Sequence, residues 1–225
     1  MYDKPKRRFT WKRALLVFLA ITLVLSSAAA FVYARYLHPT GEIMPNIYAI
    51  RNDRNGIPFV NFFLVRAGEH YIAFDAGYDP VQTENQLQRL GISADAILAV
   101  FITHDDFDHI GALDLFHNAT IYTGPIDLPQ FPHEILSDGQ IIMIEGLSIQ
   151  IIYTPGHTSG CVVYLVNGRY LFAGDLFVNP HHARYHTSLQ IQHQERVLEL
   201  DGVEYIFNGH FGLFRNIRFI RLWFG

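Results

Sequence analysis

Hydrophobic positions follow three patterns along the chain. Residues 14–34 form an uncharged and almost continuously apolar run, which is about the length that a helix needs to cross a bilayer. Beyond residue 47 the apolar residues come in short blocks separated by Gly, Pro, Asn and Asp, as expected for short strands and turns. The block Ile97–Thr103 is apolar throughout, which predicts a strand that is buried on both faces.

These blocks predict one α/β domain with much β structure over residues 47–225. The turn signal Asn55-Gly56 comes first, and Ala67-Gly68-Glu69 then joins two strands as a hairpin. Helices are predicted at Val81–Leu90 and Ser188–Leu200, the second with Thr187 or Ser188 as its N-cap. The predicted strands are Ile47–Ile50, Phe59–Arg66, Tyr71–Asp75, Ile97–Thr103, Ala119–Thr123, Ile141–Ile144, Leu147–Tyr153, Val162–Val166, Tyr170–Ala173 and Val203–Phe207.

The apolar run at residues 14–34 follows a basic segment at residues 1–13. Positive residues before an apolar helix predict that this end stays in the cytoplasm. We therefore interpret the run as a transmembrane anchor, with a linker at residues 35–46 and the domain outside the cytoplasm. The alternative is a signal peptide with a small-residue cleavage region at Ser26–Ala30, but the run continues past that region, which favours an uncleaved anchor. A buried core helix is disfavoured because no polar stripe interrupts the run.

Composition narrows the function further. Half of the 225 residues are hydrophobic, so a sizeable core can form. The net charge of −4 provides no general basic surface for nucleic acid. The tail from Phe214 to Phe224 mixes arginines with aromatic residues, which suits a membrane surface or an anionic polymer, or a last element packed on the core. The single cysteine, Cys161, excludes an intramolecular disulfide framework and is expected to be a buried, inert thiol.

Metal-binding residue types gather just beyond the ends of four predicted strands. In α/β sheets, functional sites lie at the carboxyl ends of strands, so these side chains are expected to converge. Imidazole and carboxylate groups are ligands for zinc, iron or manganese. Two ions about 3.5–4 Å apart would use the whole set. The set comprises His104, Asp106, Asp108 and His109 after the first of these strands, and His157, Asp175 and His210 after the other three.

The ordered series of motifs resembles the metallo-β-lactamase superfamily. HxxxDH follows a buried strand, TPGHT, AGD and NGH come later, and VNFFLVRAGEHYIAFDAG is similar to the superfamily's first hairpin. The resemblance covers residues 47 to 212 and implies a four-layer αββα sandwich, here preceded by the transmembrane helix. It implies one metal held by His104, Asp106 and His157, and a second held by Asp108, His109 and His210. Asp175 would bridge the two, and Asp75 would orient a ligand.

Asp106 departs from the family pattern, which is HxHxDH where this chain has HxDxDH. Two divalent ions would then face three carboxylates, where the family pattern has two. The site would be less positive, so it would acidify bound water less strongly. Zinc remains the expected metal, while the added oxygen ligand leaves manganese or iron open. Acidic residues at this position resemble two branches of the superfamily: the lactamase-like domain of competence-type DNA-uptake proteins, and the flavodiiron group.

We therefore expect a membrane-anchored, extracytoplasmic metallo-hydrolase with a hydroxide nucleophile, acting on an ester, thioester, lactone or amide-type bond. Asp108 would orient the water, and Tyr185 would donate a hydrogen bond to a developing oxyanion. His181, His182 and His186 are further candidates for contact with the substrate. The alternatives are a metal-dependent phosphodiesterase or nuclease, a di-iron redox site, and a binding module without activity. The substrate is not apparent from the sequence, and a nucleic-acid partner is not favoured.

Overall fold

The computed structural model describes residues 11–178 and 184–214, and for residues 28–36 it describes the backbone alone. Some residues of the sequence analysis lie outside the described residues. They are the first basic residues of the chain (Lys4, Lys6, Arg7 and Arg8), His181 and His182, and the arginines of the C-terminal tail. The chain divides into two compact units, Met1–Arg35 and Tyr36–Gly225.

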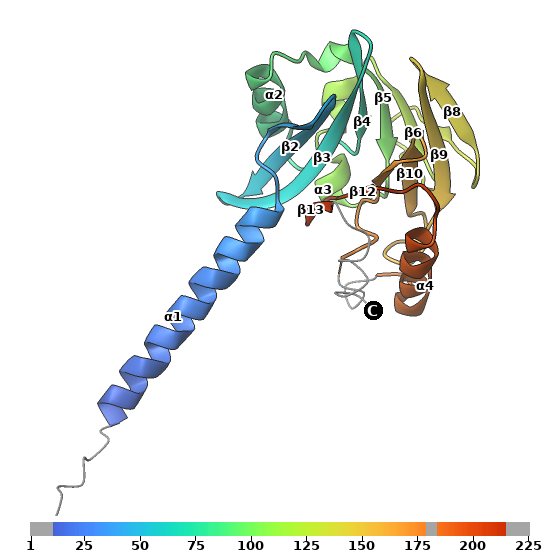
Figure 1. Ribbon diagram of the computed structural model, residues 1–225. Coiled ribbons are helices and arrows are strands. Elements are labelled where there is room, and N and C mark those ends of the chain that lie inside the picture. The colour runs from blue at the N-terminus through green and yellow to red at the C-terminus, as the bar shows by residue number, and fades with distance from the viewer. Residues whose placement is uncertain (1–10, 179–183, 215–225) are drawn as a thin grey trace, which may run out of the picture. The chain divides into compact units, whose positions relative to one another are not determined.

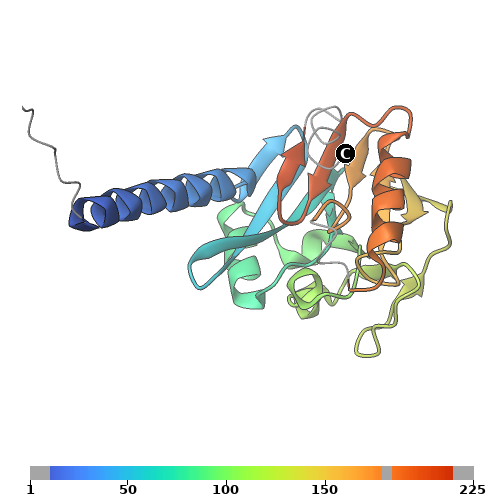
Figure 2. The ribbon, with the colours of Figure 1, turned by 90° about the horizontal axis from the view of Figure 1, so that it is seen from below.

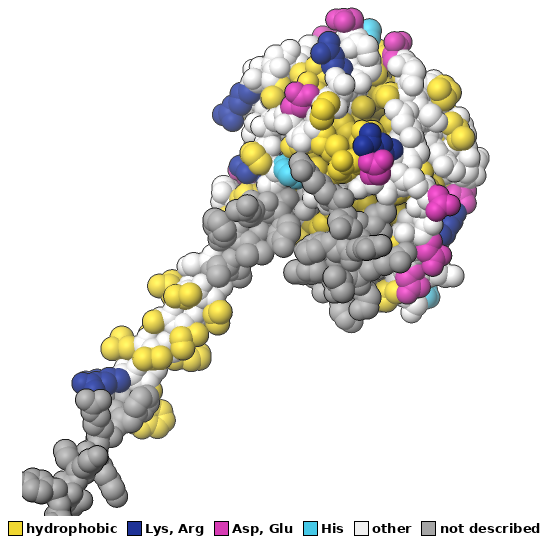
Figure 3. Space-filling model, in the orientation of Figure 1, with side chains coloured by type: hydrophobic (Ala, Val, Ile, Leu, Met, Phe, Trp, Pro, Cys, Tyr) yellow, Lys and Arg dark blue, Asp and Glu magenta, His cyan; other side chains and the backbone are white. Residues whose placement is uncertain are grey.

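The first unit contains most of helix α1 (Trp11–Tyr36). Its large apolar side chains are exposed from Leu15 to Leu25, and two hydroxyls bond back to the helix, Thr22 to the carbonyl of Phe18 and Ser26 to that of Thr22. Figure 3 shows hydrophobic side chains along this helix and basic side chains near its beginning. Within the described residues, no helix combines the length and the apolar character required of a membrane span.

The second unit contains two β-sheets (Figure 1). Strands of the first sheet follow one another in sequence order from β1 to β7, antiparallel up to β4 and parallel from β4 onward. They are β1 (Gly41–Met44), β2 (Ile47–Arg54), β3 (Ile57–Ala67), β4 (His70–Phe74), β5 (Ile97–Ile102), β6 (Thr120–Thr123) and β7 (Glu134–Ile135).

The second sheet has the order β13-β12-β11-β10-β9-β8, and its only parallel pair among the described strands is β11 with β12. Its strands are β8 (Ile141–Ile144), β9 (Leu147–Tyr153), β10 (Val162–Val166), β11 (Tyr170–Phe172), β12 (Tyr205–Asn208) and β13 (Gly212–Phe214). β10 is buried along its whole length, as expected for a strand covered on both faces.

Three apolar layers hold these elements together. Aromatic rings from both sheets meet in the central layer, where Phe74 of β4 stacks on Phe172 of β11 at 3.9 Å between ring centroids. A second layer lies between the first sheet and α2 (Pro80–Arg89) with the short helices η1 (Ala94–Ala96) and η2 (Leu113–Phe116), and a third lies under α4 (Thr187–Leu198). Figures 1 and 2 show α2 and α4 on opposite outer faces. The expected αββα order of layers is therefore present.

Local sequence rules explain where the helices begin. The Asp79 carboxylate accepts a hydrogen bond from the Gln82 backbone N–H, and Pro80 occupies the first turn of α2. The predicted N-cap of α4 was wrong by one residue. The cap is His186, whose ring nitrogen accepts from the Leu189 N–H, and the sequence rule missed it because His is not a common capping residue.

Several other boundaries also differ from the prediction. The segment at residues 35–46 is not entirely a linker, because β1 pairs with β2 there. β3 begins at Ile57 instead of Phe59, and β12 begins at Tyr205 instead of Val203. Short elements without a periodic pattern were missed, namely β7, β13 and helix α3 (Phe107–Ile110). In contrast, β8, β9 and β10 have the predicted bounds.

Candidate metal centre

Four strand ends deliver the predicted metal ligands to one place. His104, Asp106, Asp108 and His109 follow β5, and helix α3 turns the last two back toward the first. His157 follows β9, Asp175 follows β11 and His210 follows β12. The structure brings all seven together, in groups whose ligand atoms lie within 4.8 Å of one another.

The seven side chains form two groups with one residue between them. The first triad is His104, Asp106 and His157, in which Asp106 Oδ2 lies 3.6 Å from His104 Nε2 and 3.1 Å from His157 Nε2. The second triad is Asp108, His109 and His210, in which Asp108 Oδ2 lies 4.0 Å from His109 Nε2 and 3.2 Å from His210 Nε2. The division agrees with the two ligand sets that the family resemblance implies.

Asp175 lies between the two triads. Its Oδ2 is 3.9 Å from His104 Nε2, and its Oδ1 is 3.2 Å from His109 Nε2. The same carboxylate also lies near the other two histidines, 3.6 Å from His157 and 3.3 Å from His210. A single carboxylate that faces all four imidazoles has the geometry of a bridging group.

Asp75 orients histidines of both triads from behind. Its Oδ2 accepts a hydrogen bond from His109 Nδ1 at 2.8 Å, and both oxygens accept from the Thr103 hydroxyl at 2.9 Å. Because the hydroxyl proton is then used, Thr103 Oγ1 accepts from His104 Nδ1 at 2.9 Å. The Nε2 atoms of both histidines are left facing the cluster. The sequence predicted Asp75 in this role but missed Thr103, because a strand-end threonine has no distinctive pattern.

The backbone around this support is tightly constrained. Asp75 has a φ of +65°, in the left-handed region, where Asp is one of the few tolerated side chains besides glycine. At Gly174 the φ is +46°, and a Cβ atom there would lie 2.3 Å from Thr103 Oγ1. The glycine before Asp175 therefore allows the strand ends of the two sheets to approach closely.

His210 is oriented by a different partner. Its Nδ1 donates to the carbonyl oxygen of Phe59 at 2.8 Å, so its Nε2 faces Asp108 and Asp175. The rings of Phe59 and His210 lie 5.6 Å apart, and Phe59 also packs against Tyr78 at 5.4 Å. Tyr78 in turn contacts Phe107, which is 66% exposed. An aromatic ledge, defined as Phe59, Tyr78 and Phe107, thus runs outward from the second triad.

Electrostatics differ between the two triads. Burial lowers the pKa of His104 to about 3 and also lowers the pKa of His157, so both are neutral near pH 7. Burial opposes charge on His109 and His210 as well, but Asp175 and the neighbouring carboxylates outweigh it. They raise the pKa of His210 to about 10 and that of His109 well above its usual range. Burial similarly opposes charge on Asp175, and His210 and His109 together hold its pKa well below the usual value.

The chemistry of the unpartnered atoms fits a divalent metal. His104 Nε2, His109 Nε2 and Asp175 Oδ1 are buried and have no hydrogen-bond partner. Buried polar atoms without partners are costly, and here they converge from the segments that follow β5 and β11. The donors are imidazole nitrogens and carboxylate oxygens, the ligands that zinc and related ions prefer. A metal would satisfy these atoms together.

Other predicted residues lie outside the cluster. Tyr185 is 58% exposed, and its ring lies 6.5 Å from that of His186, which caps α4. Asp114 is exposed, as is His117 at the end of η2. Cys161 is buried, and burial raises its pKa to about 11, in agreement with an inert thiol. The role of Tyr185 as an oxyanion donor stays a prediction.

Two buried glutamines support the site from α4, and the sequence analysis missed them. Gln190 and Gln194 both donate to the carbonyl oxygen of Leu176, just after Asp175. The backbone of Gln190 also packs so closely on Gly156 that a Cβ atom there would lie 2.5 Å from the Gln190 Cα. Helix α4 therefore holds the loops of His157 and Asp175 in place. Buried glutamines on an amphipathic helix could have been noticed as polar residues on its apolar face.

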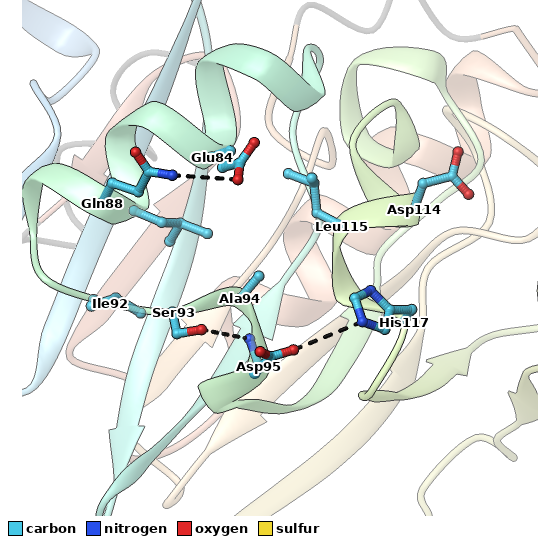
Figure 4. Close-up of a pocket in the computed structure, with 10 residues that line it drawn as sticks. Glu84, Gln88, Ile92, Ser93, Ala94, Asp95, Asp114, Leu115 and His117 are labelled. Atoms are coloured by element: carbon cyan, nitrogen blue, oxygen red, sulfur yellow. Dashed lines mark hydrogen bonds and ion pairs between the residues drawn. The ribbon is translucent and has the colours of Figure 1, made fainter.

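A separate groove of about 410 Å³ lies between α2, η1 and η2 (Figure 4). Glu84, Asp95 and Asp114 line it together with His117, and none of the candidate metal ligands does. Asp95 is already paired with Asn118 and lies 3.8 Å from His117. The histidine and aspartate cluster is therefore the stronger candidate for catalysis.

Comparison with known proteins gives consistent results. The family model of the Metallo-beta-lactamase superfamily matches residues 55–125 and 120–210. A hydroxyacylglutathione hydrolase of Aeromonas hydrophila is 32% identical over 170 residues, covering 70% of this chain and 63% of that protein. A probable polyketide biosynthesis zinc-dependent hydrolase of Bacillus velezensis is 33% identical over 118 residues, covering 49% of this chain and 51% of that protein. The chain thus spans less than two thirds of the length of these relatives.

Solved structures share the fold at low sequence identity. A metallo-beta-lactamase family protein from Thermus thermophilus superposes with a TM-score of 0.65 at 17% identity, covering 79% of this chain and 77% of that one. A B3 metallo-beta-lactamase with an active-site glutamic acid superposes with a TM-score of 0.62 at 17% identity, covering 84% and 88%. At this identity the likeness concerns the fold alone.

Proposed function

This chain belongs to the metallo-beta-lactamase superfamily, and from that premise we propose that it is a metal-dependent hydrolase with a thioester or a related acyl bond as its substrate. The observation that carries the proposal is the convergence of buried, unpartnered His104 Nε2, His109 Nε2 and Asp175 Oδ1 at the ends of strands from both sheets. Relatives named hydroxyacylglutathione hydrolase and zinc-dependent hydrolase support the choice of bond and metal.

We assign the ligands as the family pattern implies. The first triad would hold one divalent ion and the second triad another, with Asp175 reaching both. Zinc is the expected metal, because imidazole nitrogens are among its preferred ligands. Three of the triad histidines, His104, His109 and His210, have Nδ1 fixed by a hydrogen bond that turns Nε2 toward the cluster. When bound, such ions supply Lewis acidity and an activated water.

The chain's own residues have distinct tasks in this proposal. Asp75 and Thr103 keep the imidazoles of His104 and His109 aimed at the cluster. Asp108, whose pKa is held low against burial by its hydrogen bond with His210, would accept a hydrogen bond from the attacking water and orient it. The aromatic ledge would bind an apolar part of the substrate beside the reacting bond. Tyr185 is the candidate donor to the oxyanion.

The test is metal-dependent turnover by the full-length chain in mild detergent. Metal-free protein is reconstituted with zinc or manganese and assayed with a thioester, an ester, a β-lactam and a chromogenic phosphodiester. We expect hydrolysis of the thioester, and its rate should fall by about a thousandfold when a chelator removes the metal. His157→Ala should lose both metal and turnover, whereas His117→Ala, an exposed histidine outside the cluster, should lose neither.

The same experiment separates the alternatives. Preferential cleavage of the phosphodiester would replace the acyl hydrolase with a phosphodiesterase. Iron in place of zinc, in protein purified under reducing conditions, would favour a redox site. The chain would be a binding module if it turned over no substrate class and His157→Ala abolished its metal binding.

We also propose that residues 14–34 anchor the chain in a membrane, with the domain outside the cytoplasm. The support is the exposed apolar side chains of α1, the basic Lys12 and Arg13 at its beginning, and the further basic residues that precede them in the sequence. A reporter enzyme that is active only outside the cytoplasm, fused after Leu37, should be active. Activity of a reporter that works only in the cytoplasm would reverse the orientation.

A further inference from the structure

Arg184 connects two loops of the first triad. Its backbone N–H donates to the carbonyl oxygen of His157 at 2.9 Å, and two residues later the N–H of His186 donates to the carbonyl of Gly156 at 2.9 Å. The segment before α4 is thereby bonded to the loop that carries His157. The guanidinium group of Arg184 reaches across to the other loop and contacts Asp106 Oδ1.

The two carboxylate oxygens of Asp106 face different partners. Oδ2 faces the histidines of the first triad, 3.1 Å from His157 Nε2, while Oδ1 faces Arg184. Asp106 occupies the N-cap position of α3 but makes no capping hydrogen bond with its side chain. Its orientation therefore depends on what contacts it from outside its own helix.

Arg184 also offsets the carboxylate that distinguishes this chain from the family pattern. Among the described residues, it is the only lysine or arginine that forms an ion pair with a carboxylate of the two triads or with Asp175. Where the family pattern has a neutral histidine, this chain has an aspartate together with a cation.

We propose that Arg184 is a positioning residue that holds Asp106 as a one-oxygen ligand of the first metal and so preserves a preference for zinc over manganese. The inference rests on the proposed function. Zinc favours four ligands at short distances, whereas manganese suits sites richer in oxygen. A carboxylate with one oxygen occupied by a guanidinium offers a single donor, as histidine does. Without Arg184, Asp106 would be free to offer both oxygens, and the site would become richer in oxygen.

Metal affinities of the full-length, metal-free chain in mild detergent test this role. Zinc and manganese dissociation constants are measured by chelator competition for the wild type, Arg184→Ala and Arg184→Lys. We expect Arg184→Ala to lower the zinc preference, the ratio of the manganese to the zinc constant, by about tenfold, as for other residues that support a ligand. The lost positive charge acts on both divalent ions alike, so it cancels in the ratio. Lysine should restore part of the preference, because it keeps the charge but lacks the planar fork.

Two further measurements separate positioning from general stability. In an Asp106→His background, Arg184→Ala should leave the zinc preference unchanged, because no carboxylate remains to be oriented. Cobalt-substituted protein should show weaker visible absorption in Arg184→Ala than in the wild type, since added oxygen ligands move the ion away from tetrahedral geometry. Arg169→Ala, which removes an exposed arginine paired with Glu204, is the matched control and should change neither readout.

The outcomes are distinct. An unchanged zinc preference in Arg184→Ala overturns the inference alone, as does an equal change in the Asp106→His background. A wild-type chain that binds neither ion overturns the proposed function together with the inference. If the alanine variant does not fold, Arg184→Gln removes the charge while keeping a long polar side chain, and the same ratio decides.

Discussion

The two triads differ in how protons and supporting residues are distributed around them. In the first triad, the pKa values of His104 and His157 are lowered by burial, so these histidines are neutral and ready to bind a metal. In the second triad, carboxylates raise the pKa values of His109 and His210 despite burial. Both histidines are therefore positively charged in the absence of metal, with a proton on each ring nitrogen. Similar ligand types therefore favour metal binding to different degrees.

The supporting residues differ in the same way. His109 and His210 are oriented by a buried carboxylate and by a backbone carbonyl. In the first triad, Asp106 depends on the exposed side chain of Arg184, which comes from a separate loop. Both histidines of the second triad thus have their rings oriented by a hydrogen bond, but each carries an extra proton that competes with the metal. The histidines of the first triad are uncharged, but its carboxylate Asp106 depends on a more exposed contact.

Asp75→Ala should have the largest effect, because Asp75 is the support that both triads share. Removing a buried carboxylate that accepts from Thr103 and pairs with His109 should cost about 3–5 kcal/mol of the free energy of unfolding. Metal affinity should also fall at both positions. Chemical denaturation of the metal-free protein measures the first effect and chelator competition the second. Asp75→Asn keeps the shape without the charge and should be milder; equal stability of Asp75→Ala and the wild type would contradict this role.

Changing the pH should separate the triads most clearly. The pKa of His210 is raised to about 10, so its ion-pair stabilisation of the metal-free protein is fully present below its unfolded value of about 6.5 and is lost as pH rises through 10. That proton must leave before a metal binds. Affinity at the second position should therefore rise about tenfold per pH unit for each proton displaced, which is about a hundredfold between pH 6 and 8 for the His210 proton alone.

The first position should change much less over the same range, because the pKa of His104 is lowered to about 3. Chelator competition at several pH values would show two classes of site with different slopes. Calorimetry in buffers of different ionisation enthalpy would show proton release mainly for the weaker class. Equal slopes for both positions would contradict the contrast between the triads.

Asp106→His tests the departure from the family pattern directly. Replacing a carboxylate by imidazole should raise the affinity for zinc relative to manganese by about tenfold. The expected gain concerns the first position only, since Asp106 is not part of the second triad. An unchanged metal preference would mean that Asp106 does not contact the metal.

Tyr185→Phe should have the smallest effect. The side chain is 58% exposed, so a hydrogen bond from its hydroxyl to a developing oxyanion would be worth about 1 kcal/mol, or about a fivefold loss in kcat. KM should change little, because the oxyanion forms only in the transition state. A loss of a hundredfold or more would show that the hydroxyl is enclosed with the substrate.

The sequence by itself determined the fold class and the seven ligand candidates. Strands such as Leu147–Tyr153 and Val162–Val166 were predicted at their observed bounds, because apolar runs between turn residues are a local signal. The ligands were predictable because each lies a few residues beyond the end of a strand, and sites in α/β sheets gather at the carboxyl ends of strands. Short elements such as β7 and β13 had no such pattern, since their pairing depends on strands that are distant in the sequence.

Only the tertiary structure decided what surrounds each ligand. Thr103 and Arg184 have no motif that marks them, yet one connects Asp75 to His104 and the other holds Asp106. The opposite pKa shifts of His104 and His109 also could not be foreseen, although both residues follow the same strand, β5. Burial and the distance to Asp175 set these shifts, and both arise only when the two sheets bring their strand ends together.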